Sequence, residues 1–142
     1  MKLRNYGVEG TVLKWFESWL TNRVQYTRYK SELSSPLRND IGIPQGTPLS
    51  CLLFSLYIND IVNVVNYCSI NLFADDTLIW VAAETHEEAI NKINMDLKNV
   101  YEYLVKSKLA LNITKTKAMI IGSIYDEEIE IFVNENKLEI VE

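Results

Sequence analysis

The feature that most constrains the fold is a pair of adjacent aspartates, Asp75 and Asp76, between two short apolar segments within residues 69–81. Each segment is rich in β-branched and aromatic residues and too short for a helix, so the pattern predicts a strand, a tight turn and a strand. Two carboxylates about 4 Å apart repel by roughly 4 kcal/mol at an effective dielectric near 20. A magnesium ion bound by these oxygen ligands would offset the repulsion. Taken alone, the pair is more simply interpreted as a solvated turn, because aspartate is a common turn residue.

The length and composition predict one folded domain. The chain has 142 residues, of which 48% are hydrophobic, so we expect a packed core and not a disordered segment. The two cysteines, Cys51 and Cys68, lie far apart in apolar segments and predict buried free thiols of an intracellular protein. The chain shows no apolar signal core and no segment of membrane-spanning length, which disfavours secretion and a membrane partner.

The charge is unevenly distributed along the chain. The net charge of -5 argues against a nucleic-acid partner, for which a basic face is the usual footprint. Residues 1–40, however, carry seven basic and four acidic side chains, whereas residues 41–80 carry three aspartates and no basic residue. Residues 81–142 carry seven basic and twelve acidic residues. A phosphate-binding face would therefore have to be local.

The first forty residues predict a helix and a hairpin. Apolar residues recur at helical spacing over residues 8–20 and predict a short amphipathic helix whose aromatic side chains belong to the core. Alternation over residues 24–29 and 37–41 predicts two strands, joined by a turn at residues 34–36. Four basic side chains lie on this hairpin: Arg23, Arg28, Lys30 and Arg38. They are candidates for phosphate contacts, although a solvated face is the favoured interpretation.

Residues 42–50 contain two glycines and two prolines and predict a rigid loop before a helix. Gly46 permits close approach of the backbone to a ligand, while Thr47 is a natural N-cap and Pro48 suits the first helical turn. The helix expected over residues 49–65 is apolar nearly all round, which predicts a buried central helix. A helix start behind a glycine loop can bind an anion, but this pattern is weak by itself.

The second half of the chain predicts one long helix and further strands. A Thr-x-x-Glu capping box followed by an apolar stripe predicts a helix over residues 85–106. His86, the only histidine, falls in its exposed first turn, so we do not expect it to be catalytic. Residues 118–121 predict a strand, and residues 128–141 predict a hairpin with a turn around residues 134–136.

Five short motifs follow one another along the chain. They are Tyr6-Gly7-Val8 with the segment from Trp15 to Arg23, the loop from Gly42 to Pro48, Leu52-Leu53-Phe54 with Leu56-Tyr57-Ile58-Asn59-Asp60, Phe73-Ala74-Asp75-Asp76-Thr77, and Leu109-Ala110-Leu111-Asn112 with Lys115-Thr116-Lys117. In this order and at this spacing they resemble the palm of a reverse transcriptase, of the kind encoded by LINE-like or jockey-like retrotransposons without long terminal repeats. The resemblance favours the metal-binding interpretation of the aspartate pair over the solvated turn.

This resemblance implies an activity and its cofactor. Asp75 resembles the aspartate that binds both catalytic metals, and Asp76 resembles its less direct neighbour. Two magnesium ions would activate the primer 3′-hydroxyl and steady the leaving pyrophosphate. The implied reaction is RNA-directed DNA synthesis from deoxynucleoside triphosphates, with an RNA template and a DNA primer as partners.

The resemblance also implies substrate-binding residues. Gln45 and Gly46 look like the loop that lies against the incoming nucleotide and the template, and Phe73 and Ala74 would place the hairpin beneath the primer end. Lys115 is similar to the family's lysine near the triphosphate, a candidate for protonating or neutralising pyrophosphate. A surface lysine in a loop is an equally good interpretation of Lys115.

The resemblance predicts a partial domain. In the family another metal-binding aspartate and most of the fingers precede the segment that Tyr6 opens, and a thumb follows the palm, so residues 1–142 are expected to lack these parts. Because preorganised charge is usually the largest catalytic term, we expect the isolated chain not to polymerise DNA. The expected fold class is an α/β (α+β) palm fragment, in which a small antiparallel sheet carrying Asp75 and Asp76 is backed by the helices at 49–65 and 85–106. The implied location is the nucleus or cytoplasm.

Two alternatives remain open at this stage. The first is a catalytically dead palm that acts, if at all, as a nucleic-acid or protein binding module. The second keeps the enzyme class and changes its setting to a group II intron or another bacterial-type reverse transcriptase. The sequences of two motifs, Tyr57-Ile58-Asn59-Asp60 and Phe73-Ala74-Asp75-Asp76, favour the retrotransposon.

Overall fold

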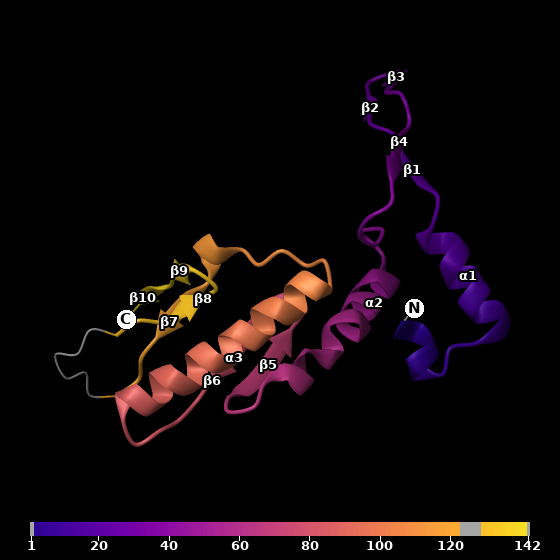
Figure 1. The fold of residues 1–142 in the computed structure, drawn as a ribbon. Coiled ribbons are helices and arrows are strands. Elements are labelled where there is room, and N and C mark those ends of the chain that lie inside the picture. Colours follow the sequence, from indigo (N-terminus) through magenta and orange to yellow (C-terminus); the bar gives the residue numbers. More distant parts are fainter. Residues whose placement is uncertain (1, 123–128, 142) are drawn as a thin grey trace. The chain divides into compact units, whose positions relative to one another are not determined.

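The computed structural model describes residues 2–122 and 129–141 and divides into two compact units, Met1–Asn59 and Asp60–Glu142 (Figure 1). The first unit contains the 3-10 helix η1 (Lys2–Tyr6), the helices α1 (Gly10–Leu20) and α2 (Pro48–Ile58), and the strands β1 (Arg23–Gln25), β2 (Arg28–Tyr29), β3 (Glu32–Leu33) and β4 (Leu37–Asn39). The 3-10 helix η2 (Asn59–Val64) follows α2 directly. No described helix has both the length and the hydrophobicity that a membrane span requires.

The elements of the second unit are one long helix, short strands and a further 3-10 turn. They are β5 (Ser69–Phe73), β6 (Asp76–Trp80), α3 (His86–Lys106), the 3-10 helix η3 (Ile113–Lys115), β7 (Lys117–Met119), β8 (Phe132–Val133), β9 (Asn136–Lys137) and β10 (Glu139–Val141). The mixed α+β class predicted from the sequence is therefore confirmed. Four of the five described strand pairs are antiparallel, and β7 pairs with β10 in parallel.

The core of the first unit lies between η1, α1 and α2. Leu3, Leu13 and Leu53 are its buried members. Partly buried side chains surround them: Val8, Phe16, Trp19, Leu20, Ile43, Leu49 and Leu56. The helix predicted over residues 8–20 is confirmed with a start at Gly10. Only part of its aromatic face is buried in the core, because Trp15 is 52% exposed. The Trp15 ring stacks on Trp19 with 5.8 Å between the ring centroids.

Helix α2 is shorter and more exposed than the sequence predicts. Its start is as expected, with Pro48 in the first turn and the Thr47 side chain accepting a hydrogen bond from the Ser50 N–H at 3.2 Å. The α-helix ends at Ile58, and the chain continues as the 3-10 helix η2. Leu52 is 56% exposed, so the prediction of a helix buried all round is wrong. An apolar surface shows which side chains favour burial, but not whether a neighbouring element covers them.

The hairpin between α1 and α2 turns at a different place from the one predicted. Tyr29 pairs with Glu32, so the chain reverses at Lys30, whose φ is +54°. The predicted turn at residues 34–36 is wrong, because this segment interrupts the ladder between the β2–β3 pair and the β1–β4 pair. The Ser34 N–H donates to the Thr27 carbonyl at 2.9 Å, which keeps the two arms paired across the interruption.

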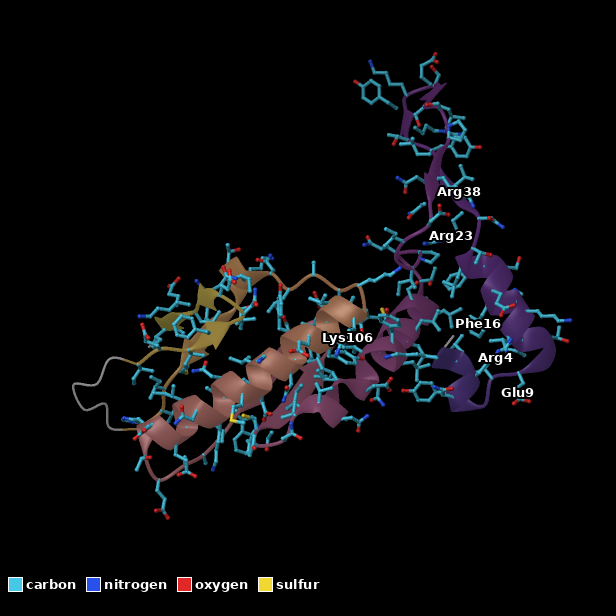
Figure 2. All side chains as sticks on the ribbon, viewed as in Figure 1. Arg4, Glu9, Phe16, Arg23, Arg38 and Lys106 are labelled. Carbon is cyan, nitrogen blue, oxygen red and sulfur yellow. The ribbon has the colours of Figure 1, made fainter. Side chains whose placement is uncertain are left out.

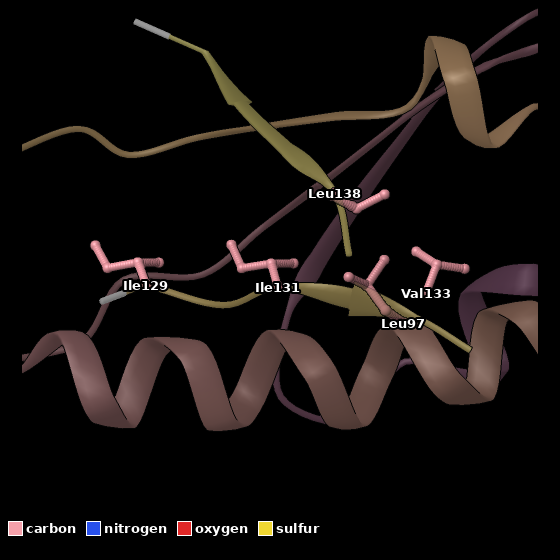
Figure 3. Close-up of a cluster of buried hydrophobic side chains, with 5 residues drawn as sticks. All are labelled: Leu97, Ile129, Ile131, Val133 and Leu138. Carbon is pink, nitrogen blue, oxygen red and sulfur yellow. The ribbon is translucent and has the colours of Figure 1, made fainter. Parts of the chain in front are cut away.

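The core of the second unit lies along α3 (Figure 3). Leu97 from the helix packs with Ile129, Ile131, Val133 and Leu138 from the C-terminal segment. The helix predicted over residues 85–106 is confirmed, and the Thr85 side chain accepts from the Glu88 N–H at 3.3 Å as the capping box requires. Asn94 adds a polar clamp, since its side chain donates to the Glu130 carbonyl at 3.1 Å and accepts from the Phe132 N–H at 2.8 Å.

The C-terminal hairpin has its predicted turn but a shorter ladder. Strands β8 and β9 pair around Asn134, whose φ is +54°. The chain then leaves this pair at Leu138 and forms β10, which runs parallel to β7. The prediction for residues 128–141 also includes residue 128, which lies outside the described residues.

Candidate functional site

The aspartate hairpin forms as the sequence predicts. Strands β5 and β6 pair over five residues each, from Ser69 opposite Trp80 to Phe73 opposite Asp76. Ala74 and Asp75 make the two-residue turn, and Ala74 has a φ of +53°. Two-residue hairpin turns need such a left-handed residue because their twist then matches that of the strands. The turn therefore puts the two carboxylates at the tip of the hairpin, one in the turn and one at the start of β6.

Both aspartates are exposed, and neither forms an ion pair with another residue of the described ranges. Among residues 2–122 and 129–141, no three Asp, Glu, His or Cys side chains lie close enough together to hold a metal ion. The donor set at the turn is thus two carboxylates. This set suits magnesium, which is usually held by one or two carboxylates together with substrate phosphates. It falls short of a site formed by protein ligands alone.

One side of the hairpin is apolar and open. Phe73 is 81% exposed, Leu78 is 61% exposed and Trp80 is 50% exposed. A shallow hollow of about 260 Å³ lies along the two strands and is lined by Asn71, Leu72, Phe73, Asp76, Thr77 and Leu78. The other side is tied to the unit through Ile79, which packs against the core cluster that contains Leu97 of α3. The carboxylates therefore stand at the end of a hairpin anchored on one face.

A buried carboxylate of α3 fixes the backbone that leads into β5. Asp96 is 0% exposed and accepts hydrogen bonds from the N–H groups of Asn66, Tyr67 and Cys68 at 2.9, 2.7 and 2.8 Å. Burial alone would raise the pKa of Asp96, but these hydrogen bonds favour the ionised form and hold its pKa below the usual value. Ser69, the first residue of the aspartate hairpin, follows this segment directly.

The sequence interpretation missed Asp96. The signal that could have identified it is its phase, because it lies on the same helical stripe as Ile93, Leu97 and Val100. An acidic residue within an apolar stripe predicts a buried carboxylate with partners. The partners themselves are three backbone groups 28 to 30 residues away in the chain, which no local pattern identifies.

The cysteines differ from the prediction of buried thiols. Both are free, but Cys51 is exposed and Cys68 is only partly buried. Burial raises the pKa of the Cys68 thiol to about 12, and its hydrogen bond to the neighbouring Asp96 carboxylate adds to the rise. Cys51 precedes Leu52 in α2, and both side chains are exposed.

The other predicted site residues lie outside the aspartate hairpin, on a loop and on a 3-10 turn. Gln45 and Gly46 belong to the first unit, where they are exposed and where Gly46 has a φ of +83°. The Ser50 hydroxyl donates to the Pro44 carbonyl and so ties this loop to the start of α2. In the second unit the exposed Lys115 is the last residue of η3. The Asn112 side chain caps this 3-10 helix by accepting a hydrogen bond from the Lys115 N–H at 3.3 Å. The structure thus joins Phe73, Ala74, Asp75 and Asp76 in one hairpin, while Lys115 lies elsewhere in that unit.

A comparison with protein families identifies the chain. The family model described as "Reverse transcriptase (RNA-dependent DNA polymerase)" matches residues 1–139. The chain belongs to the reverse transcriptase family. No curated protein and no solved structure was found to match it. The match covers nearly the whole chain, so the exposed carboxylate pair lies within the matched residues.

Proposed function

We propose that this chain is the palm part of a reverse transcriptase of a LINE-like or jockey-like retrotransposon, whose activity is RNA-directed DNA synthesis. The observation that carries the proposal is the family match over residues 1–139, together with an exposed pair of carboxylates at the turn of a hairpin within the matched region. The substrates are deoxynucleoside triphosphates, an RNA template and a DNA primer. The retrotransposon setting rests on the amino-acid sequences of the motifs at residues 57–60 and 73–76.

Asp75 and Asp76 are the proposed magnesium ligands, with two ions in the complete enzyme. Their oxygen donors, their exposure and the absence of an ion pair between either aspartate and a described lysine or arginine fit this role. Bound ions would make the primer 3′-hydroxyl a better nucleophile and stabilise charge on the leaving pyrophosphate. The left-handed Ala74 keeps the two carboxylates at the tip, and Asp96 keeps the hairpin entry in place.

The remaining residues have proposed roles in substrate binding. Phe73 and Ala74 lie beneath the primer end, and the open apolar side of the hairpin at Phe73 supports a contact there. Gln45 and Gly46 lie against the incoming nucleotide and template, and their exposure in a fixed loop supports this. Lys115 neutralises or protonates the pyrophosphate, for which an exposed lysine is suitable.

We further propose that the 142-residue chain is inactive by itself. Within the described ranges the two aspartates have no third acidic, histidine or cysteine ligand nearby. Preorganised charge at the reacting centre is usually the largest contribution to catalysis, and removal of a single stabilising group often costs about 100- to 1000-fold in rate. An incomplete ligand set therefore predicts extension below detection.

Primer extension on an RNA template tests the proposal. The assay uses the 142-residue chain and the longest product of the reading frame that contains it, with magnesium and deoxynucleoside triphosphates. We expect extension from a longer product, abolished by Asp75→Asn and retained in the control Glu87→Gln/Glu88→Gln. This control removes two adjacent exposed carboxylates in the first turn of α3.

Each outcome distinguishes the proposal from its alternatives. Extension by the isolated chain would contradict its proposed inactivity. Extension that survives Asp75→Asn would contradict the metal-binding role. If even the longest product extends nothing, the polymerase proposal fails, and the alternative of a catalytically dead palm is favoured.

A further inference from the structure

The hairpin between α1 and α2 has two parts with different surroundings. Its arms, β1 and β4, adjoin the helices of the first unit, while the β2–β3 pair forms its far end (Figure 1). Figure 2 shows side chains projecting outward around this far end and the labelled Arg23 and Arg38 at the base. The four basic residues of the hairpin are therefore divided between base and tip.

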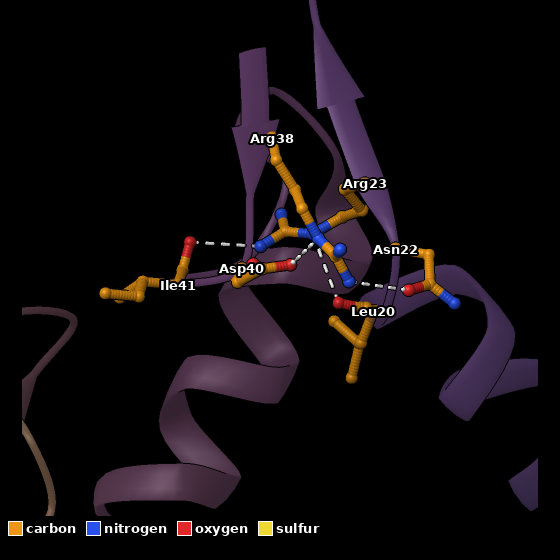
Figure 4. A network of polar contacts seen from close by, with 6 residues as sticks. All are labelled: Leu20, Asn22, Arg23, Arg38, Asp40 and Ile41. Atoms are coloured by element: carbon orange, nitrogen blue, oxygen red, sulfur yellow. Dashed lines mark hydrogen bonds and ion pairs between the residues drawn. The ribbon is translucent and has the colours of Figure 1, made fainter.

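The two arginines at the base are engaged in internal contacts (Figure 4). The Arg23 guanidinium donates to the carbonyl oxygens of Leu20 at 3.2 Å and Ile41 at 3.0 Å. The Arg38 guanidinium donates to Asp40 and to the Asn22 side chain, both at 3.0 Å. These bonds join the two arms where they leave the helices. Arg23 and Arg38 thus explain the geometry of the base and are poor candidates for binding a ligand.

The two cations at the tip are available. Arg28 and Lys30 are exposed, and neither forms a side-chain hydrogen bond or an ion pair with any described residue. Lys30 lies over the ring of Tyr29, with 5.4 Å from Nζ to the ring centroid, and that ring is still 71% exposed. Tyr26, two residues before Arg28, is 59% exposed. The tip therefore presents two cations without an ion pair to a described residue, one of which lies over the open ring of Tyr29, and a second exposed tyrosine precedes Arg28 by two residues.

The local charge differs from that of the whole chain. Residues 23–40 carry four basic and two acidic side chains, within a chain of net charge -5. Asp40 is paired with Arg38 at the base, which leaves Glu32 as the acidic residue of the tip. A negatively charged partner is therefore attracted to this end of the hairpin.

We propose that the β2–β3 tip binds single-stranded RNA, with Arg28 and Lys30 on phosphates and Tyr29 and Tyr26 stacked on bases. Exposed aromatic rings interleaved with cations are the combination by which proteins bind single strands, because every base has a face on which a ring can stack. A duplex has no unstacked base to offer, so this surface favours a single strand. The assignment of that strand to the RNA template rests on the proposed polymerase function.

Fluorescence anisotropy with a labelled, unstructured oligouridylate tests this surface on the 142-residue chain. Tyr29→Ala is expected to weaken binding roughly 5- to 100-fold, whereas Tyr29→Phe keeps the ring and the affinity. Arg28→Gln/Lys30→Gln is expected to reduce the slope of log affinity against log salt by about 1.4. The control Lys14→Gln/Lys98→Gln removes two exposed lysines outside the hairpin and should change binding by less than about twofold.

Photocrosslinking adds a readout that needs no variant. Thiouridine-substituted RNA should crosslink to the peptide that contains Tyr26 and Tyr29. Neither assay contains a metal ion, a DNA primer or a deoxynucleoside triphosphate. The result is therefore independent of the primer-extension test with Asp75→Asn.

Three results would overturn the inference. They are an equal loss of affinity in the lysine control, crosslinks that fall outside residues 23–40, and tighter binding of duplex RNA than of the single strand. Weaker binding of RNA than of a DNA strand of the same sequence would overturn the assignment to the template.

Discussion

Replacing Asp96 should destabilise the chain more than replacing any other acidic residue of α3. Its carboxylate accepts three backbone N–H groups, and it is 0% exposed. In Asp96→Ala the N–H groups of Asn66, Tyr67 and Cys68 lose their partner. The segment they belong to leads directly into β5, so the entry to the aspartate hairpin would loosen as well.

The magnitude follows from the three bonds. A hydrogen bond to a charged group contributes about 1.5–3 kcal/mol, and bonds that share one acceptor are not additive. We therefore expect Asp96→Ala to lower the free energy of unfolding by about 4 kcal/mol, a large part of the roughly 5–15 kcal/mol that a domain possesses. In Asp96→Asn one oxygen can still accept from Tyr67 and Cys68, while the amide group faces the N–H of Asn66. The expected cost is then about 2 kcal/mol.

The pH dependence gives a second test. The backbone N–H groups hold the pKa of Asp96 below its usual value despite burial. A depressed folded-state pKa means that the ionised group stabilises the fold above the unfolded pKa of about 3.9, and that this contribution is lost as the pH falls through the lower folded value. Urea unfolding followed by circular dichroism should therefore show a gap between wild type and Asp96→Asn at about pH 7 that narrows in acid.

Glu102→Gln provides the matched control. Glu102 is an exposed acidic residue of the same helix and pairs with Lys106 at 3.7 Å, so its loss should cost less than about 1 kcal/mol. The reasoning fails if Asp96→Ala costs no more than this control. It also fails if the gap between Asp96→Asn and wild type is the same in acid as at neutral pH.

Three further predictions concern packing, backbone strain and thiol reactivity. Leu97→Ala should lower the free energy of unfolding by about 2–5 kcal/mol because Leu97 is buried in the α3 core. Its neighbour Met95 is 52% exposed and should tolerate alanine within about 0.5 kcal/mol. Equal costs in urea unfolding would contradict the core assignment. Ala74→Gly should raise the free energy of unfolding by up to about 1 kcal/mol, because Ala74 has a φ of +53° and glycine adopts this conformation without strain. A lower free energy of unfolding in the same assay would count against a left-handed residue at this turn. Cys51 should react with a thiol reagent near neutral pH much faster than Cys68, whose pKa is raised to about 12; similar rates would refute this.

Elements defined by local chemistry could be predicted from the sequence. The capping box at Thr85 and the stripe behind it locate α3, because both act within a few residues of one another. The aspartate hairpin is similar, since two short β-prone segments joined by two residues allow only one close pairing. The local pattern predicts the position of Asp75 and Asp76 at the turn. Their role as metal ligands stays a prediction that rests on the resemblance to reverse transcriptases.

Features that depend on distant partners could not be predicted. The turn of the first hairpin lies at Lys30 and not at Ser34-Ser35-Pro36, because the contact between Thr27 and Ser34 lets pairing continue across the proline. The exposure of Leu52 depends on what covers α2, which a composition pattern does not contain. Asp96 needs three amides from another segment, so its role became visible only in the structure.

The most direct test of the central claim is whether divalent metal binds at the Asp75–Asp76 turn. Manganese, a paramagnetic substitute for magnesium, can be titrated into the isotope-labelled chain while amide resonances are recorded. The account predicts that broadening begins at residues 73–77 and is lost in Asp75→Asn/Asp76→Asn. Broadening that begins equally at Glu87 and Glu88, or that survives the double substitution, would contradict it.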